Sequence, residues 1–348
     1  MGRSGGGTRL RILHAGDDVC GIPSLLAEQQ RRLGHDARAL RFSRNAYGFD
    51  GDIDVAYDRS WSKARRLAVR LGALARQAPR FDVVHLHGYD NILPHVLGTP
   101  LLRALGKTVV MHFHGCEVRQ AALAGDGEGL YCRECALRAD CDLTAQLRRR
   151  RVAERWADAI LCSTPDLLSA VPTARYIPNP VDMERWPAAP ASPRNGTLRV
   201  VHIPSSPALK GTAHVESAVA ELQGRGYPVE LVMATGVPHR DVPALWASAD
   251  VVVDQLNVGW YGVAAIEAMA IGRPAAAYLL PALAAQHGEP PLIRITRDDA
   301  AAVLARAVDE PDWREEMARR GREYAHTVHD ARRVAEQVVG VYREALHA

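Results

Sequence analysis

The segment Gly259–Pro274 reads GWYGVAAIEAMAIGRP, and it decides how the second half of this chain folds. A strand is expected over Asp250–Leu256 (DVVVDQL), the loop after it ends at Gly262, and a helix begins at Val263. The first N–H groups of a helix lack internal acceptors and lie at the positive end of its dipole. They form a binding site for phosphate, and Gly262 lets a ligand approach the backbone closely.

Glu267 lies in the second turn of the same helix. Helical side chains lean toward the N-terminus, so its carboxylate faces the phosphate site. A carboxylate suits sugar hydroxyls rather than phosphates, and the ribose of a nucleotide supplies such hydroxyls. The alternative is a structural role, in which Glu267 only stabilises the helix dipole. The phosphate site beside Glu267 favours the first role, in which its carboxylate binds the ribose of a nucleotide.

The rest of the chain alternates strands with amphipathic helices, which predicts parallel sheets with helices on both faces. Helices are expected over Ile22–Leu33 and Trp61–Arg76, the latter with Leu67, Leu71 and Leu74 on one face. Strands are expected in the first half at Leu10–Ala15, Asp36–Phe42, Asp82–His87, Thr108–His114, Ala159–Ser163 and Ala174–Ile177. The pattern restarts with strands at Arg199–Ile203, Val229–Ala234, Asp250–Leu256 and Ala275–Leu279. This predicts two doubly wound, Rossmann-like α/β domains that face each other across a cleft.

The Pro- and Ala-rich stretch Trp186–Gly196 has the composition of a linker. We therefore expect an N-terminal acceptor-binding domain over 9–183, a linker over 184–197 and a nucleotide-sugar-binding domain over 198–325. The last helical stretch, 326–348, is expected to pack back on the N-terminal domain. In such sheets, ligands bind at the carboxyl ends of the strands.

Length and composition limit the function classes. The 348 residues suit two domains, and 47% hydrophobic with 24% charged residues is typical of globular proteins. No apolar run reaches the roughly eighteen residues that span a bilayer. The start MGRSGGGTRL has no apolar core, so a cytoplasmic, reducing location is expected.

The net charge of +3 is unevenly distributed: residues 1–183 carry +6 and the remainder −3. This indicates an anionic partner for the first half. The basic stretches Lys63–Arg70 and Arg148–Arg151 predict peripheral contact with an anionic membrane at its inner face, or else are solvated helix faces. Aromatic residues are too sparse among them to favour nucleic acid.

Three further segments are expected to meet the opening segment at the strand ends. They are GDDVCG (16–21), HFHG (112–115) and SSPALKG (205–211). In the last of these, Lys210 can balance a diphosphate while Ser205 and Ser206 supply hydroxyls around it. On the strand DVVHLH, His85 is expected in the interior and His87 near the cleft.

The chain resembles the GT-B glycosyltransferases of family 4, which are retaining and use nucleotide sugars. The resemblance rests on DVVHLHG (82–88), HFHG (112–115), IPNPVD (177–182), SSPALKG (205–211) and YGVAAIEAMAIGRP (261–274). It implies three catalytic residues, His114 beside the transferred sugar, Lys210 on the diphosphate and Glu267 on the ribose. The donor-binding residues that it implies are Gly21, Ser205, Ser206, Lys210, Gly262, the amides of Val263, Ala264 and Ala265, and Glu267.

The resemblance also implies a hexosyl- or N-acetylhexosaminyl-type transfer from a nucleoside-diphosphate sugar to a hydroxyl of a surface glycan or secondary metabolite, with no further cofactor. Two positions depart from the family. Its members carry a first glutamate where this chain has Gly259, and an arginine where this chain has Pro204 and Ser205. Asp254, Gln255 or Tyr261 would then contact the sugar instead.

Two other functions remain open: a sugar-nucleotide epimerase on the same fold, and a nucleotide-sugar-binding subunit without catalysis. A NAD-dependent dehydrogenase is disfavoured because no GxGxxG follows the first strand.

Cys132, Cys135 and Cys141 in CRECALRADC have the spacing of a zinc knuckle, with Cys116 or Cys162 as a fourth ligand. The alternative is a loop whose cysteines only pack, because no second CxxC completes the set. The resemblance itself implies no catalytic metal.

Overall fold

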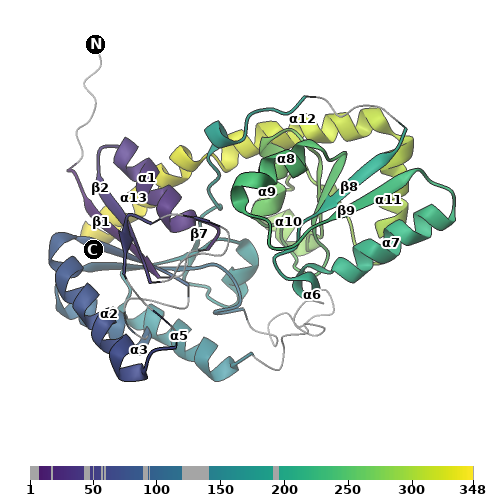
Figure 1. Cartoon of the computed structure of the whole chain (residues 1–348). Coiled ribbons are helices and arrows are strands. Elements are labelled where there is room, and N and C mark those ends of the chain that lie inside the picture. The colour runs from purple at the N-terminus through teal and green to yellow at the C-terminus, as the bar shows by residue number, and fades with distance from the viewer. Residues whose placement is uncertain are drawn as a thin grey trace, which may run out of the picture.

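The computed structural model describes residues 8–16, 19–42, 48–49, 51–55, 58, 60–88, 93, 95–119, 141–190 and 196–347. Within them the chain forms two sheets, with seven strands in the first half and five in the second (Figure 1). Every strand pairing within these sheets is parallel. The predicted α/β class with two doubly wound domains is confirmed.

The N-terminal sheet has the strand order β3-β2-β1-β4-β5-β6-β7. Its strands are β1 (Arg11–Gly16), β2 (Asp36–Arg41), β3 (Ile53–Asp54), β4 (Val83–His87), β5 (Thr108–Phe113), β6 (Ala159–Cys162) and β7 (Arg175–Tyr176). The chain first builds outward from β1 to β3, then continues on the other side of β1 with β4. The order reverses between β1 and β4, which is where such sheets open a ligand crevice.

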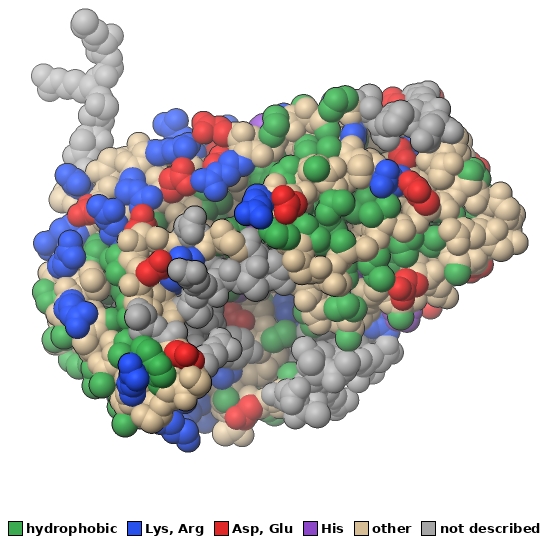
Figure 2. Space-filling model, in the orientation of Figure 1, with side chains coloured by type: hydrophobic (Ala, Val, Ile, Leu, Met, Phe, Trp, Pro, Cys, Tyr) green, Lys and Arg blue, Asp and Glu red, His purple; other side chains and the backbone are tan. Residues whose placement is uncertain are grey.

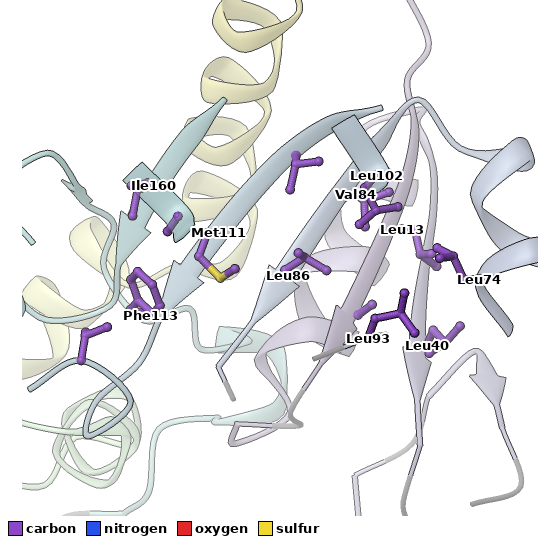
Figure 3. Close-up of a cluster of buried hydrophobic side chains, with 14 of the residues drawn as sticks. Leu13, Leu40, Leu74, Val84, Leu86, Leu93, Leu102, Met111, Phe113 and Ile160 are labelled. Carbon is purple, nitrogen blue, oxygen red and sulfur yellow. The ribbon is translucent and has the colours of Figure 1, made fainter. Parts of the chain in front are cut away.

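Successive side chains along these strands point to opposite faces of the sheet, so the domain has two hydrophobic cores, one on each face. Leu86 of β4 and Phe113 of β5 belong to the core shown in Figure 3, which also contains Leu74 of α2, Leu102 of α3 and Ala153 of α5. The helices on this face are α2 (Lys63–Gln77), α3 (His95–Ala104) and α5 (Leu143–Trp156). The opposite face is covered by α1 (Ile22–Arg32) and α13 (Ala331–His347), which pack on each other.

The C-terminal sheet has the order β12-β11-β10-β8-β9, and it reverses between β8 and β10. Its strands are β8 (Leu198–His202), β9 (Val229–Met233), β10 (Val251–Gln255), β11 (Ala275–Ala277) and β12 (Ile293–Arg294). Its helices are α6 (Pro207–Lys210), α7 (Thr212–Gly224), α8 (Val242–Ala247), α9 (Val263–Ala270), α10 (Pro281–His287), α11 (Ala300–Asp309) and α12 (Pro311–Val328). The core on one face includes residues of α8 and α9, and the core on the other includes residues of α7 and α11.

The expected strands and helices differ from the observed ones at their ends, and some elements were not expected, among them the strands β3 and β12 and the helices α10 and α11. The three leucines expected on one face of α2 differ in burial: Leu74 is buried, whereas Leu67 and Leu71 are 41% and 43% exposed.

The chain passes between the domains twice, once near Val181 and once near His329. Hydrogen bonds join these two crossing segments. α12 packs on α9 of the C-terminal domain, and α13 then lies on α1 of the N-terminal domain (Figure 1). At the return point Val181 donates its N–H to the carbonyl of His329 at 2.8 Å, and Ala331 donates to the carbonyl of Val181 at 3.0 Å. His329 Nδ1 also donates to the carbonyl of Asn179 at 2.9 Å. These bonds fix where the two domains meet.

Candidate functional site

The start of α9 is arranged to accept an anion. Gly262 precedes the helix in an extended conformation, and Ile266 makes the first backbone bond, donating to the carbonyl of Gly262 at 3.4 Å. The amides of Val263, Ala264 and Ala265 therefore lie ahead of the helix's own hydrogen bonds. They sit at the positive end of the dipole.

Glu267 is held firmly one turn further along α9. Its side chain is buried, and its two carboxylate oxygens accept different hydrogen bonds. His239 Nε2 donates to one oxygen at 2.8 Å, and Trp246 Nε1 donates to the other at 3.3 Å. Neither partner was anticipated from the sequence. The two bonds hold the carboxylate in place.

Lys210 is paired with a buried acid. Its Nζ lies 2.7 Å from Oδ1 of Asp254 and 2.8 Å from Oε1 of Gln255. The other oxygen of Asp254 accepts the N–H of Gly262 at 2.5 Å. Because β8 and β10 are neighbours at the point where the strand order reverses, the lysine after β8 and the acid in β10 meet there. Asp254 thus joins the lysine turn to the start of α9.

A side chain at Gly262 would crowd that ion pair. A Cβ at Gly262 would lie 3.2 Å from both Asp254 Oδ2 and Lys210 Nζ. The glycine was expected to make room for a ligand, and the structure shows it also makes room for Asp254. Ser205 is exposed and Ser206 half-buried beside Lys210, whose N–H donates to the carbonyl of Ser206 at 3.0 Å.

The position at which the resemblance led us to expect a glutamate, Gly259, is crowded by a neighbour. A Cβ at Gly259 would lie 2.9 Å from Cβ of Leu280. The three residues expected to replace that glutamate are otherwise engaged: Asp254 and Gln255 contact Lys210, and the hydroxyl of Tyr261 lies 2.9 Å from His329 Nε2.

A pocket of about 610 Å³ lies between the two domains. Val263 and Glu267 line it from the C-terminal domain, and Gly21 lines it from the start of α1. The structure therefore brings these three predicted residues together. The other predicted residues, Ser205, Ser206, Lys210, Gly262, Ala264, Ala265 and His114, are not among its lining residues. The segment GDDVCG is described only in part, because Asp17 and Asp18 lie outside the described residues.

Phe49 connects the two walls of this pocket. Gly21 has a φ of +71°, and a Cβ there would lie 2.5 Å from the ring of Phe49. The same ring lies 4.6 Å, centroid to centroid, from the imidazole of His239, which holds Glu267. A contact path thus crosses the cleft from Gly21 to Glu267. Phe49 has no sequence motif around it, so sequence reasoning missed it.

The predicted sugar neighbour, His114, belongs to a cluster of five histidines on the face of the N-terminal sheet under α1 and α13. Register explains the cluster: His14 pairs with His85, and His87 pairs with His112, across neighbouring strands. Four of the five are buried and His114 is half-buried. His85 is in the interior as expected, but His87 is fully buried rather than lining the cleft.

These histidines close a ring of hydrogen bonds with Gln30, Ser163 and Tyr342. The successive distances are Gln30–Tyr342 3.3 Å, Tyr342–His85 2.5 Å, His85–His112 3.2 Å, His112–Ser163 3.5 Å, Ser163–His114 2.5 Å, His114–His87 2.9 Å, His87–His14 3.0 Å and His14–Gln30 2.8 Å. The Gln30 amide sets one direction, since its NH₂ donates to Tyr342 and its oxygen accepts from His14. When the Ser163 hydroxyl donates to His114 Nδ1 rather than to the carbonyl of Phe113 at 3.2 Å, each histidine donates through Nε2 and accepts through Nδ1. Both nitrogens of His114 are therefore used inside the ring.

The ring requires neutral histidines. Burial lowers the pKa of His14 to about 4 and that of His114 to about 3, and it holds the pKa values of His85, His87 and His112 well below their usual range. Two triads, His14/His85/His87 and His87/His112/His114, are compact enough for a metal ion. However, His112 and His114 are stacked at 4.3 Å with an interplanar angle of 29°, so their in-plane lone pairs do not converge. The arrangement suits hydrogen bonding rather than coordination.

The expected cysteine site falls largely outside the described residues. Cys132 and Cys135 are not described, and Cys141 is exposed. Cys162 is buried in the core of the N-terminal domain, and burial raises the pKa of its thiol. A buried thiol with a raised pKa is a poor zinc ligand.

Sequence comparisons find no match: no protein-family model matches the chain, and no curated protein matches it significantly. Solved structures do match. Sucrose-phosphate synthase from Thermosynechococcus elongatus superimposes with a TM-score of 0.70 at 16% identity, covering 96% of this chain and 98% of that one. The fold is GT-B.

Other GT-B structures agree. HepE from Anabaena in complex with UDP-glucose matches with a TM-score of 0.68 at 12% identity, over 97% of this chain and all of that one. A UDP-N-acetylglucosamine 2-epimerase matches with a TM-score of 0.58 at 13% identity, over 97% and 98%. At these identities the likeness shows the fold alone, and glycosyltransferases and an epimerase share it.

Proposed function

We propose that this protein is a retaining glycosyltransferase of the family 4 type, which transfers a sugar from a nucleoside-diphosphate sugar to a hydroxyl acceptor. The observation that carries the proposal is the interdomain pocket. One wall presents the start of α9 and the fixed carboxylate of Glu267, and the other presents the start of α1 at Gly21. HepE, on the same fold, is bound to UDP-glucose in its structure.

In the proposed complex the amides of Val263, Ala264 and Ala265 bind the donor diphosphate, and Glu267 binds the ribose hydroxyls. As the glycosyl bond breaks, negative charge accumulates on the leaving diphosphate. Preorganised N–H groups stabilise that charge, which is the largest catalytic effect of such sites. The leaving phosphate takes the proton of the acceptor hydroxyl on the same face of the sugar, so no separate protein base is needed.

Lys210 would join this site by exchanging part of its contact with Asp254 for the diphosphate. Asp254 keeps the ammonium group at the start of α9 when no donor is bound. Together with Ser205 and Ser206, Lys210 would complete the phosphate site. The resemblance implies that His114 lies beside the transferred sugar. To contact the sugar, His114 would have to break one of its hydrogen bonds within the histidine ring.

The epimerase alternative is favoured by the structural matches to UDP-N-acetylglucosamine 2-epimerases. That chemistry needs carboxylates free to move protons over the sugar. The described carboxylates that line the pocket besides Glu267 are each ion-paired: Glu28 with Arg32 and Arg185, Asp52 with Arg31, and Asp182 with Arg185. Because these carboxylates are ion-paired and are not free to move protons, they support the transferase over the epimerase.

Thermal unfolding with UDP-, GDP- and dTDP-sugars tests the donor site. One donor should raise the midpoint, and Glu267→Gln should remove the rise, while the exposed control Glu221→Ala should keep it. Release of the nucleoside diphosphate with and without acceptor then separates the activities. A transferase releases it faster with acceptor, an epimerase converts the sugar without acceptor, and a binding subunit does neither. If no nucleotide sugar shifts the midpoint, the donor-site proposal fails.

A further inference from the structure

Exposed apolar side chains gather on one face of the N-terminal domain. Among the described residues, nine large hydrophobic side chains are exposed, and seven of them lie on α2, α3 and α5 or directly after α3. These seven are Leu67, Leu71, Leu97, Leu101, Leu105, Leu143 and Trp156. Single exposed leucines are normal on protein surfaces, but such a concentration on one face indicates a contact surface.

The same three helices concentrate positive charge. They carry eleven arginines and lysines against a single acid, Glu154. Since the whole chain has a net charge of +3, these three helices together are +10, with Arg70 buried among them, and the remaining residues are −7. Lys and Arg side chains lie beside apolar ones along the lower left of the molecule in Figure 2, where Figure 1 places α2 and α3.

A groove between α2 and α3 continues the apolar surface. It encloses about 710 Å³ and is lined by Leu71, Leu74 and Ala75 of α2, by Leu101 and Leu105, and by Ala78, Pro79 and Lys107. Seven of these eight lining residues are apolar, and the ammonium group of the eighth, Lys107, donates to the carbonyl of Phe81 at 2.9 Å. The groove is on the opposite face of the sheet from α1, which lines the interdomain pocket.

We propose that the face formed by α2, α3 and α5, the basic leucine face, docks this protein on an anionic lipid bilayer. Leucines flanked by arginines match the boundary between acyl chains and phosphate headgroups, where each kind of side chain finds its own environment. A nucleic acid would attract the arginines but would leave the leucines in water. The opposite charge of the rest of the chain orients this face toward the bilayer.

The contact is peripheral. In the part of the chain that the structure describes, no helix is both long and apolar enough to cross a membrane. The side chains reach the headgroup level while the two domains remain in water. The docking does not depend on the proposed function, but one consequence does: the acceptor would be a lipid-linked hydroxyl, held near the N-terminal domain.

Co-sedimentation with vesicles tests the docking. Vesicles of 30% phosphatidylglycerol in phosphatidylcholine are compared with pure phosphatidylcholine at low and high salt, and about tenfold more protein should bind the anionic vesicles. Two triple variants change exposed positions only: Leu71→Ser/Leu101→Ser/Leu105→Ser, and Arg65→Glu/Arg76→Glu/Arg151→Glu. Each should reduce the bound fraction at least severalfold and leave the thermal unfolding midpoint near that of the wild type.

Matched controls carry changes of the same kind on other surfaces. Met233→Ser/Leu346→Ser removes the two other large exposed apolar side chains among the described residues, and Arg320→Glu/Arg332→Glu/Arg333→Glu reverses three exposed charges on α12 and α13. Both should bind vesicles like the wild type. The proposal is overturned if anionic vesicles do not bind the protein, if the controls lose binding equally, or if the leucine variant binds fully. If the leucine variant binds vesicles fully and binds heparin as well as the wild type does, the face is a general binding surface for polyanions. Donor binding, measured in parallel, should be unchanged in every variant.

Discussion

The hydroxyl of Tyr261 lies 2.9 Å from Nε2 of His329 and joins the segment that begins α9 to the point where the chain returns to the N-terminal domain. Nδ1 of His329 donates to the carbonyl of Asn179, so Nε2 is the acceptor and Tyr261 the donor. Tyr324 lies 3.0 Å from the same hydroxyl. One tyrosine therefore ties the start of α9 to α12 and to the point where the chain returns to the N-terminal domain.

We predict that Tyr261→Phe lowers the free energy of unfolding by about 1–3 kcal/mol, because it leaves the buried His329 nitrogen without a donor. Denaturant unfolding measures this change. Tyr227→Phe, which removes a hydroxyl from the half-buried Tyr227 after α7, should change it by no more than about 0.5 kcal/mol. Equal effects at the two tyrosines would contradict the assigned contact.

Lys210→Ala should both weaken donor binding and destabilise the fold. The carboxylate of Asp254 is completely buried, so removal of the lysine leaves an unpaired buried charge and should cost about 3–5 kcal/mol. The second variant Lys210→Ala/Asp254→Asn removes that charge. It should recover most of the stability in denaturant unfolding but none of the donor affinity. Recovery of both would show that Lys210 acts on the fold alone.

The histidine ring predicts a loss of stability in weak acid. The folded-state pKa of His14, about 4, lies below its ordinary value of 6.5, so the unfolded chain binds the proton more readily. The stabilisation is complete above pH 6.5 and is lost as the pH falls toward 4, and for His114 toward 3. Each histidine contributes a slope of up to about 1.4 kcal/mol per pH unit.

Unfolding measured at pH 7, 6 and 5 checks this slope. His85→Gln cannot be protonated and should flatten it, whereas the exposed His347→Gln should not. An unchanged slope in His85→Gln would contradict the assignment of the acid sensitivity to the ring.

Tyr342→Phe opens the ring at the C-terminal helix. It removes the donor to His85 Nδ1 and the acceptor of the Gln30 amide, so it should destabilise the protein by about 1–3 kcal/mol. Side-chain ¹⁵N spectra provide the sharper test, because the wild type should show all five ring histidines protonated on Nε2. A mixture of tautomers in the wild type would contradict the single direction of the ring.

Sequence patterns predicted the fold well because strand alternation and helical periodicity depend on local spacing. The edge strands β3 and β12 were missed because two residues show no period. The positions of Val263 and Glu267 followed from helix geometry. Their partners His239 and Phe49 did not, because each approaches from a segment distant in sequence and only packing brings them together. The ring likewise depends on Tyr342, whose place opposite His85 follows from the return of α13.

Gly259→Glu introduces the glutamate that the family resemblance expects at this position. A Cβ at this position lies 2.9 Å from Cβ of Leu280, so the change forces a shift of the segment after β11 and should cost about 1–3 kcal/mol. Leu280→Gly in the same chain removes the Cβ that causes the clash, so Gly259→Glu should cost less stability in the Leu280→Gly background than in the wild type, measured by thermal unfolding. Gly272→Ala provides a contrast: its φ of +82° is strained, but its nearest neighbour is the flexible side chain of Arg322 at 3.8 Å, so Leu280→Gly should not reduce its cost. If Leu280→Gly reduces the cost of both changes equally, the steric explanation for Gly259 is wrong.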